Sequence, residues 1–224
     1  GKLKAPLRAL RGKNPASSNT DINTPTVPRD ISPPPPVYLS QMQRDLPASL
    51  PASLYAFYLP QFHAIPENSE WWGDGFTEWT NVKKAKPLFK DHNQPIIPGE
   101  LGYYDLIKQP NIQVQQAKMA RENGIDGFVY YQYWFDTNKM LLEKPAENML
   151  ANKKINVPFC FCWANETWKG VWHGLDDNKT LIEQKYRGEE GYIAYFKYLL
   201  PFFKDERYIK VKNKPMFHVY RTED

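Results

Sequence analysis

The chain has 224 residues, of which 42% are hydrophobic and 15% aromatic, and its formal net charge at pH 7 is +4. This apolar content is enough for a folded core, but no apolar run approaches the roughly 20 residues that are needed to span a bilayer. The first fifty residues carry seven Lys or Arg and three Asp or Glu, so they account for the whole charge excess. A nucleic-acid-binding face would need clustered basic residues on the folded part. We therefore expect neither a membrane span nor a nucleic-acid partner.

Residues 1–51 are predicted to form a Pro-rich, disordered linker. They hold ten of the twenty prolines, including Pro33–Pro36, and neither Trp nor Phe. Such a segment buries too little apolar surface to offset the entropy that ordering would cost. The proline run has polyproline character and could bind an SH3-like partner, but a linker is the simpler interpretation. A linker implies an upstream domain in the same polypeptide.

The cysteines and the N-terminal residues indicate a reducing compartment. The chain begins without an apolar leader segment, and its two cysteines, Cys160 and Cys162, are too few for a disulfide framework. They alternate with phenylalanines in an apolar run, which is typical of buried structural thiols rather than redox-active ones. We expect a cytoplasmic protein.

From residue 52 onward, apolar runs alternate with amphipathic segments. The near-continuous apolar runs are typical of buried parallel strands, and they cover residues 54–59, 125–131, 157–163 and 215–220, with a short extra strand at 180–183. Caps and helically spaced apolar residues predict helices over residues 110–124, 141–151 and 189–204. A long segment rich in Trp, Pro and Gly separates the first strand from the first helix.

This order of strands and helices predicts an α/β fold in which helices cover a parallel sheet. A doubly wound sheet and a TIM-type (β/α)8 barrel both fit the order. A complete barrel usually needs about 250 residues. If the fold is a barrel, the chain therefore holds roughly its first half, with an open edge on either side.

Parallel α/β folds place their sites at the carboxyl ends of the strands. Each predicted strand is followed by polar groups mixed with aromatic side chains, in the segments Pro60–His63, Gln132–Phe135, Ala164–Trp168 and at Arg221. Aromatic rings stack on the C–H faces of sugars, while carboxylates and amides bind hydroxyl groups, so this mixture favours a carbohydrate site. The substrate-binding candidates at this rim are Gln61, His63, Tyr133, Trp134, Asn165 and Trp168.

Glu166 is the strongest catalytic candidate, because it follows an apolar strand and lies between Trp163 and Trp168. A carboxyl group among indole rings loses hydration, which raises its pKa and suits it to act as a general acid. The alternative is a structural carboxylate that caps the next helix or pairs with Lys169.

The long segment after the first strand supplies the candidates for a second carboxylate. Segments of this length in a compact domain are usually functional. The stretch Trp71–Trp79 holds Glu78 as a second catalytic candidate, with Trp72 and Asp74 as substrate-binding candidates. Glycosidic-bond chemistry uses two carboxyl groups about 5–10 Å apart. A self-packed aromatic loop with solvated acids is the alternative interpretation.

The histidines do not have the spacing of metal ligands, and the sequence has no glycine-rich phosphate loop, so we expect no metal and no cofactor. His218 lies inside an apolar strand and is more typical of a core histidine. His63 follows the first strand, where a substrate-binding role and a structural role are equally open.

Several motifs resemble the WbsX family, a group of glycoside hydrolase family 99-like domains found in bacterial polysaccharide and O-antigen gene clusters. These motifs are Tyr58-Leu-Pro-Gln-Phe-His63, Trp71-Trp-Gly-Asp-Gly-Phe-Thr-Glu-Trp-Thr-Asn-Val82, Gly124-Ile-Asp-Gly-Phe128, Tyr133-Trp-Phe135, Cys162-Trp-Ala-Asn-Glu166, Leu200-Pro-Phe-Phe-Lys204 and Lys214-Pro-Met-Phe217. The match runs in order from about Leu54 to the C-terminus and does not cover residues 1–50.

The resemblance implies a (β/α)8 barrel, of which residues 52–224 would be the N-terminal half, and an oligo- or polysaccharide substrate. It places Glu166 where the related endo-mannosidases carry catalytic carboxylates, although the flanking residues differ from their histidine- and proline-flanked acidic pair. We expect an enzyme that hydrolyses or transfers glycosyl groups in bacterial cell-surface polysaccharide or O-antigen synthesis, and that is inactive as half a barrel. The alternative is a non-catalytic glycan-binding barrel attached to an upstream synthesis enzyme. A second carboxylate that faces Glu166 would favour the enzyme.

Overall fold

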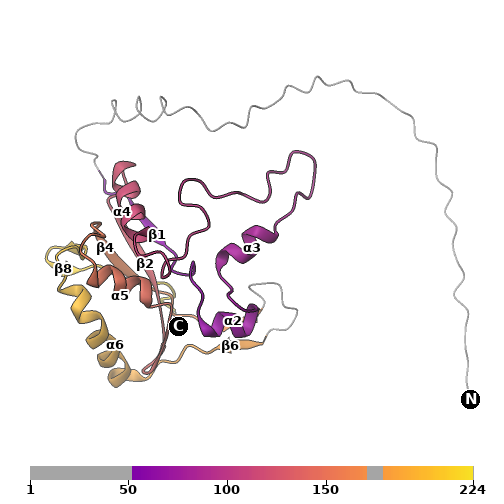
Figure 1. The fold of residues 1–224 in the computed structure, drawn as a ribbon. Helices are drawn as coiled ribbons and strands as arrows, with labels where there is room; N and C mark the ends of the chain where they lie inside the picture. Colours follow the sequence, from indigo (N-terminus) through magenta and orange to yellow (C-terminus); the bar gives the residue numbers. More distant parts are fainter. Residues whose placement is uncertain (1–51, 171–178, 224) are drawn as a thin grey trace, which may run out of the picture. The chain divides into compact units, whose positions relative to one another are not determined.

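The computed structural model describes residues 52–170 and 179–223, all of them within the compact unit Leu50–Asp224. The linker predicted for residues 1–51 lies outside the described residues. One sheet contains, in chain order, β1 (Tyr55–Tyr58), β2 (Gly127–Asp136), β4 (Phe159–Trp163) and β9 (Phe217–Val219) (Figure 1). Each neighbouring pair is parallel. The predicted parallel sheet, with its strands in sequence order, is confirmed.

A glycine permits the close approach of the strands at the start of β2. Gly127 lies beside Tyr55 of β1, and the next residue, Phe128, lies beside Phe159 of β4. A Cβ atom on Gly127 would lie 2.8 Å from the carbonyl oxygen of Pro158, which is closer than two such atoms pack. A strand glycine of this kind marks a place where backbones come together.

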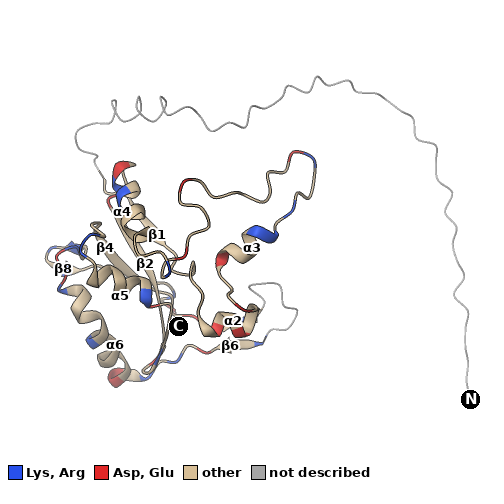
Figure 2. Ribbon diagram, in the orientation of Figure 1, with Lys and Arg blue, Asp and Glu red and all other residues tan. Residues whose placement is uncertain are grey.

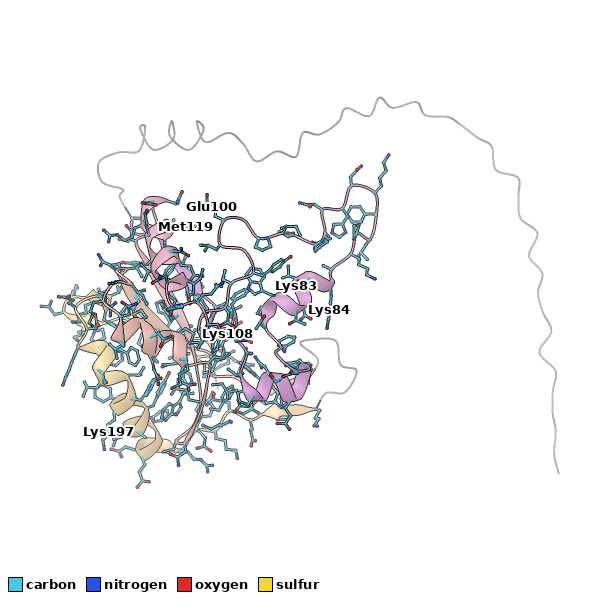
Figure 3. The ribbon with its side chains drawn as sticks, viewed as in Figure 1. Lys83, Lys84, Glu100, Lys108, Met119 and Lys197 are labelled. Atoms are coloured by element: carbon cyan, nitrogen blue, oxygen red, sulfur yellow. The ribbon has the colours of Figure 1, made fainter. Side chains whose placement is uncertain are left out.

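Three helices cover one face of the sheet, namely α4 (Ile112–Glu122), α5 (Lys144–Ala151) and α6 (Gly188–Phe203) (Figure 1). The chain leaves α4 through Gly124, whose φ of 79° is a conformation that glycine adopts easily. α6 buries Tyr195, Leu199 and Phe202. Lys197 lies on the outer side of α6 (Figure 3). These positions follow the helical spacing of the apolar residues.

The second predicted helix begins later than residue 141, at Lys144. The preceding residues instead form β3 (Lys139–Leu141), which pairs antiparallel with β2 and sets Leu141 beside Tyr133. Pro145 stands in the first turn of α5, where its missing N–H has no intrahelical partner to lose.

The long segment between β1 and α4 contains two short helices that the sequence pattern did not indicate, α2 (Pro66–Trp72) and α3 (Glu78–Lys84). Local interactions hold α3 in place. Thr77 and Thr80 form a reciprocal capping box at its start. Glu78 in its first turn and Lys83 and Lys84 in its last turn complement the helix dipole (Figures 2 and 3).

Two further strand pairs are short and antiparallel. They are β5 (Trp168–Lys169) with β6 (Thr180–Ile182), and β7 (Lys210–Val211) with β8 (Lys214–Pro215). The first pair confirms the extra strand predicted near residues 180–183.

Side chains alternate between the two faces of the sheet, and both faces are aromatic. On the helix-covered face, Phe161 packs on Phe202 of α6 with ring centroids 5.0 Å apart. On the opposite face, Tyr131 stacks with Phe57 and Tyr133 at centroid distances of 5.1 and 6.5 Å. β2 and β4 are buried on both faces, which explains why they are near-continuous apolar runs in the sequence.

β1 and β9 stand at the two edges of the sheet, and each has a single strand partner among the described residues. The observed architecture is therefore an α/β fold with an open parallel sheet. Closure of this sheet into a (β/α)8 barrel stays a prediction.

A buried ion pair joins the C-terminal ends of α5 and α6. The side chains of Asp205 and Arg207 are 0% and 7% exposed, and 2.9 Å separates Oδ2 from Nη2. The guanidinium also donates hydrogen bonds to the backbone carbonyl oxygens of Met149, Asn152 and Ile155 at the end of α5. Hydrogen bonding to Arg207, foremost among several causes, holds the pKa of Asp205 well below its usual range.

We predict that Arg207→Met lowers the free energy of unfolding at neutral pH by about 3–5 kcal/mol, because it leaves Asp205 buried without its main partner. The contribution of the pair is present above the unfolded-state carboxyl pKa of about 3.9 and is lost as the pH falls toward the lowered folded-state pKa. Urea denaturation of both proteins at several pH values measures the difference, which should shrink in acid.

The matched control is Arg187→Met, which breaks the exposed ion pair with Asp136 and should change stability little. The stabilising role of the Asp205–Arg207 pair would be contradicted if Arg207→Met changed stability little at neutral pH. It would also be contradicted if the change did not depend on pH.

Candidate functional site

A cavity of about 200 Å³ opens at the carboxyl ends of β1, β2 and β4. Its walls come from the residues that end these strands, from α2 and from the β5–β6 pair. Predicted site residues that line it are Gln61, Trp72, Tyr133, Glu166 and Trp168. The structure therefore brings together candidates from three separate parts of the sequence.

Tyr133, near the end of β2, connects the polar groups of this cavity. It is 5% exposed, and its phenol oxygen accepts a long hydrogen bond of 3.5 Å from the side-chain amide of Gln61. Burial raises the pKa of the phenol, and the negative charges of Glu78 and Glu166 raise it further. The phenol therefore stays protonated at neutral pH and can donate a hydrogen bond.

Glu78 is not among the residues that line the cavity, but the start of α3, which carries it, is attached to the end of β1. It is the first residue of α3, and its backbone N–H donates to the carbonyl oxygen of Gln61 at 3.2 Å. The side-chain amide of Gln61 meanwhile contacts Tyr133. Gln61, which follows β1, therefore links the long segment to the central strand β2.

Glu166 follows β4 in a tight turn, in which its backbone N–H donates to the carbonyl oxygen of Ala164 at 3.0 Å. The alternative role as a helix cap is wrong, because the element that follows is β5 rather than a helix. Lys169, the other alternative partner, lines the same cavity. An ammonium group and a carboxylate thus border the space that a ligand would occupy.

The indole of Trp168 gives this cavity a rigid aromatic wall. Its ring meets those of Tyr133, Phe135 and Trp71 edge-on, with centroid distances of 5.0, 5.4 and 6.2 Å. Edge-to-face pairs of this kind are favourable and directional. The orientation of the wall is therefore set by the protein before any ligand binds.

Asn165 has a different position from the one predicted. It is 2% exposed, and its side chain donates 2.7 and 3.0 Å hydrogen bonds to the carbonyl oxygen of Arg221 and the hydroxyl of Tyr186. Its Oδ1 accepts from the backbone N–H of Arg221 at 2.8 Å. Instead of lining the cavity, the amide ties the segment after β9 to the end of β4.

Trp134 lies on the opposite face of the sheet from Tyr133, so the prediction that the two share one cavity is corrected. Its ring stacks on Tyr195 of α6 at a centroid distance of 4.7 Å. The reason is that β2 continues to Asp136, and successive side chains of a strand point to opposite faces. Only one of two neighbouring aromatic residues can therefore face the ligand space.

His63 and Asp74 also lie outside the lining of the cavity. His63 is 2% exposed, and burial lowers the pKa of its imidazole, which keeps the ring neutral near pH 7. Asp74 is exposed between Gly73 and Gly75, which both have positive φ values. Their positions favour a structural role for His63 and a solvated turn at Asp74.

Sequence reasoning missed Asn68, Tyr131 and Tyr220, which line the cavity as well. Asn68 and Trp72 are four residues apart, so they lie on the same side of a helix. This spacing would have indicated a shared position only if residues 66–72 had been predicted to form a helix. Tyr131 precedes Tyr133 by one strand period.

Two further properties concern cofactors and membranes. In residues 52–170 and 179–223, no group of three or more His, Cys, Asp or Glu side chains is placed to hold a metal ion. Over the same ranges, no helix combines the length and apolar character needed to cross a membrane.

The chain is similar to one protein family and to two curated proteins. The sequence model of the family described as Glycosyltransferase WbsX matches residues 54–224. Uncharacterized proteins called WxcX, from two strains of Xanthomonas campestris pv. campestris, are 44% identical over 176 residues, which are 79% of this chain and 25% of theirs. The chain spans about a quarter of the length of these curated relatives.

Among solved structures, the GH99 endo-alpha-mannosidase from Bacteroides thetaiotaomicron matches with a TM-score of 0.42 and 13% identity. The match covers 78% of this chain and 43% of that protein. A likeness of this size does not support an inference about function.

The two cysteines are predicted to be unreactive in the folded protein. Burial raises the pKa of Cys160 to about 12 and that of Cys162 to about 11, so almost no thiolate is present near pH 8. Ellman's reagent should therefore react with them roughly 10²-fold more slowly than with a free thiol. Both should react rapidly after unfolding in denaturant. Fast stoichiometric labelling of the native protein would show that at least one thiol is accessible and activated.

Proposed function

The chain belongs to the WbsX glycosyltransferase family, and on this premise we propose that its cavity binds one sugar unit of an oligo- or polysaccharide and that its carboxylates act on a glycosidic bond. The observation that carries the proposal is an aromatic cavity at the carboxyl ends of the strands, whose lining combines the carboxylate of Glu166 with Tyr133 and Trp168.

The size and the lining of the cavity fit a single sugar ring. Its volume of about 200 Å³ is below the roughly 300–1,000 Å³ of sites for drug-sized ligands. Trp72 and Trp168 provide aromatic surface for the C–H face of a ring, while Gln61 and Lys169 provide hydrogen-bond donors for hydroxyl groups. Further sugars of the same substrate would extend beyond this cavity.

The chemistry of glycosidic bonds assigns different tasks to the two carboxyl groups. One protonates the leaving oxygen, and the other stabilises or attacks the developing positive charge at the anomeric carbon or activates the acceptor. We assign the first task to Glu166, which lines the cavity, and the second to Glu78. Tyr133 would donate a hydrogen bond to a substrate oxygen. The same groups serve hydrolysis and glycosyl transfer, which differ in whether water or a sugar hydroxyl accepts the glycosyl group.

We extend the proposal to the longer protein. Additional strands would close the sheet at β1 and β9 into a (β/α)8 barrel, and residues 52–224 alone would be inactive. The substrate would be a bacterial cell-surface polysaccharide or O-antigen, handled in the cytoplasm. Family membership and the two open sheet edges support this extension.

A non-catalytic glycan-binding role is the second candidate. Among the residues that line the cavity in the described part of the chain, Glu166 is the single carboxylate, whereas aromatic rings form much of the wall. Such a surface would hold a sugar without any acid–base chemistry.

We predict that Glu166→Gln in the longer protein lowers turnover by roughly 10²–10⁴-fold with little change in Tm, because it keeps shape and hydrogen bonding but removes the ionisable carboxyl group. Activity can be followed without a purified substrate through the surface-polysaccharide profile of a strain that lacks the gene. Wild-type protein should restore the profile, and Glu166→Gln should not.

The matched control is Glu183→Gln, the same chemical change at a side chain that is 63% exposed and pairs with Lys185. It should restore the profile as wild type does. If Glu166→Gln also restores it, the catalytic role is wrong and the glycan-binding role gains. A loss of function that only follows a loss of Tm would mark Glu166 as structural.

A further inference from the structure

Asn68 on α2 lines the cavity, and the nitrogen of its buried side-chain amide is unpaired. The residue is 1% exposed and belongs to the cavity lining. Its Nδ2 has no hydrogen-bond partner among the residues that the structure describes. Buried N–H donors are almost always paired, since leaving one unpaired costs folding free energy. An unpaired donor in a residue that lines a cavity is therefore a candidate to pair with an oxygen of a bound ligand.

The position of Asn68 on its helix supports the same interpretation. α2 buries Asn68, whereas Trp71 and Trp72 of the same helix are only half-buried. A helix that contributes to a core normally buries its apolar residues and exposes its amides. Here the amide occupies the inner position, and Trp72, one helical turn further on, borders the same space.

We propose that Asn68 is a specificity-determining residue of the sugar site, whose Nδ2 donates a hydrogen bond to one hydroxyl oxygen of the ring bound beside Trp72. This inference rests on the proposed function, because it names the contact by which that site selects its sugar. A buried donor rejects a ligand that offers no acceptor at that position, since the N–H group then stays unpaired. Asn68 would thus select both the sugar and its orientation.

Gln113 provides a matched control elsewhere in the chain. It is also a buried amide, 4% exposed, but its Nε2 donates a 2.8 Å hydrogen bond to the carbonyl oxygen of Pro145. Gln113 therefore represents an amide that the fold itself has paired, at a place outside the cavity lining.

The first measurement is the melting temperature of the unliganded protein. Asn68→Leu removes the unpaired amide at similar volume and should leave Tm unchanged or raise it. Gln113→Met removes a paired amide and should lower Tm. If Asn68→Leu lowers Tm as much as Gln113→Met does, Asn68 has a structural role and the inference is overturned.

The second measurement is sugar binding by the longer protein, titrated with the methyl glycosides of glucose, galactose, mannose, rhamnose and N-acetylglucosamine and followed by Trp fluorescence. For a glycoside that binds, monodeoxy analogues locate the hydroxyl in contact. Wild type should bind one analogue about 10-fold more weakly than the parent glycoside, because a tenfold change in Kd corresponds to the loss of about one hydrogen bond. Asn68→Leu should bind the parent about 10-fold more weakly and should not distinguish it from that analogue.

The outcomes separate this inference from the proposed function. If Asn68→Leu binds the parent glycoside with the Kd of wild type, the assignment of Asn68 is wrong while the sugar site stands. If wild type binds none of the glycosides, the sugar site itself is contradicted and the inference fails with it. Gln113→Met should keep the binding and the discrimination of wild type.

Discussion

The central strand, β2, constrains every other part of the described region, because it pairs with β1, β4 and β3. Its pleat gives each side chain one of two environments. Tyr130 and Trp134 pack in the core beneath the helices, whereas Tyr131 and Tyr133 form the aromatic surface of the cavity. A shift of one residue in register would exchange the two sets. The same backbone hydrogen bonds therefore specify both the core and the site.

The polar groups of the site come from short segments that are stabilised by local interactions rather than by the pairing of the sheet. Glu78 depends on a capping box and on one backbone hydrogen bond to Gln61, and Asn68 lies on a seven-residue helix. Helices this short have little intrinsic stability. The aromatic sheet supplies the rigid support, and short locally held segments bring charged and amide groups to it. This division lets polar chemistry vary without disturbing the packing of the sheet.

Sequence reasoning predicted the parts of this fold that depend on periodic burial. The parallel strands and α6 follow from apolar runs and from helical spacing, because burial on a regular face leaves a regular pattern. Sequence reasoning failed where individual interactions, rather than a periodic pattern, determine where an element ends or where a side chain lies. The second strand was predicted to end at Tyr131, but β2 continues to Asp136, so Trp134 was taken for a rim residue. α2 was missed because its first turn depends on Pro66 rather than on an apolar stripe. Asn165 was misjudged because its partner, Arg221, lies far along the chain.

The open margins of the sheet have a practical consequence for anyone who produces this stretch by itself. Phe57 beside the first margin is 60% exposed, and Val219 and Tyr220 beside the second are 41% and 53% exposed. Unpaired strand edges with apolar flanks are templates on which another chain can add a strand. Purification of the isolated stretch would therefore be limited by self-association in a concentration-dependent way. Charged substitutions at the exposed residues Tyr55 of β1 and Val219 of β9 would improve its solubility without reaching the cavity.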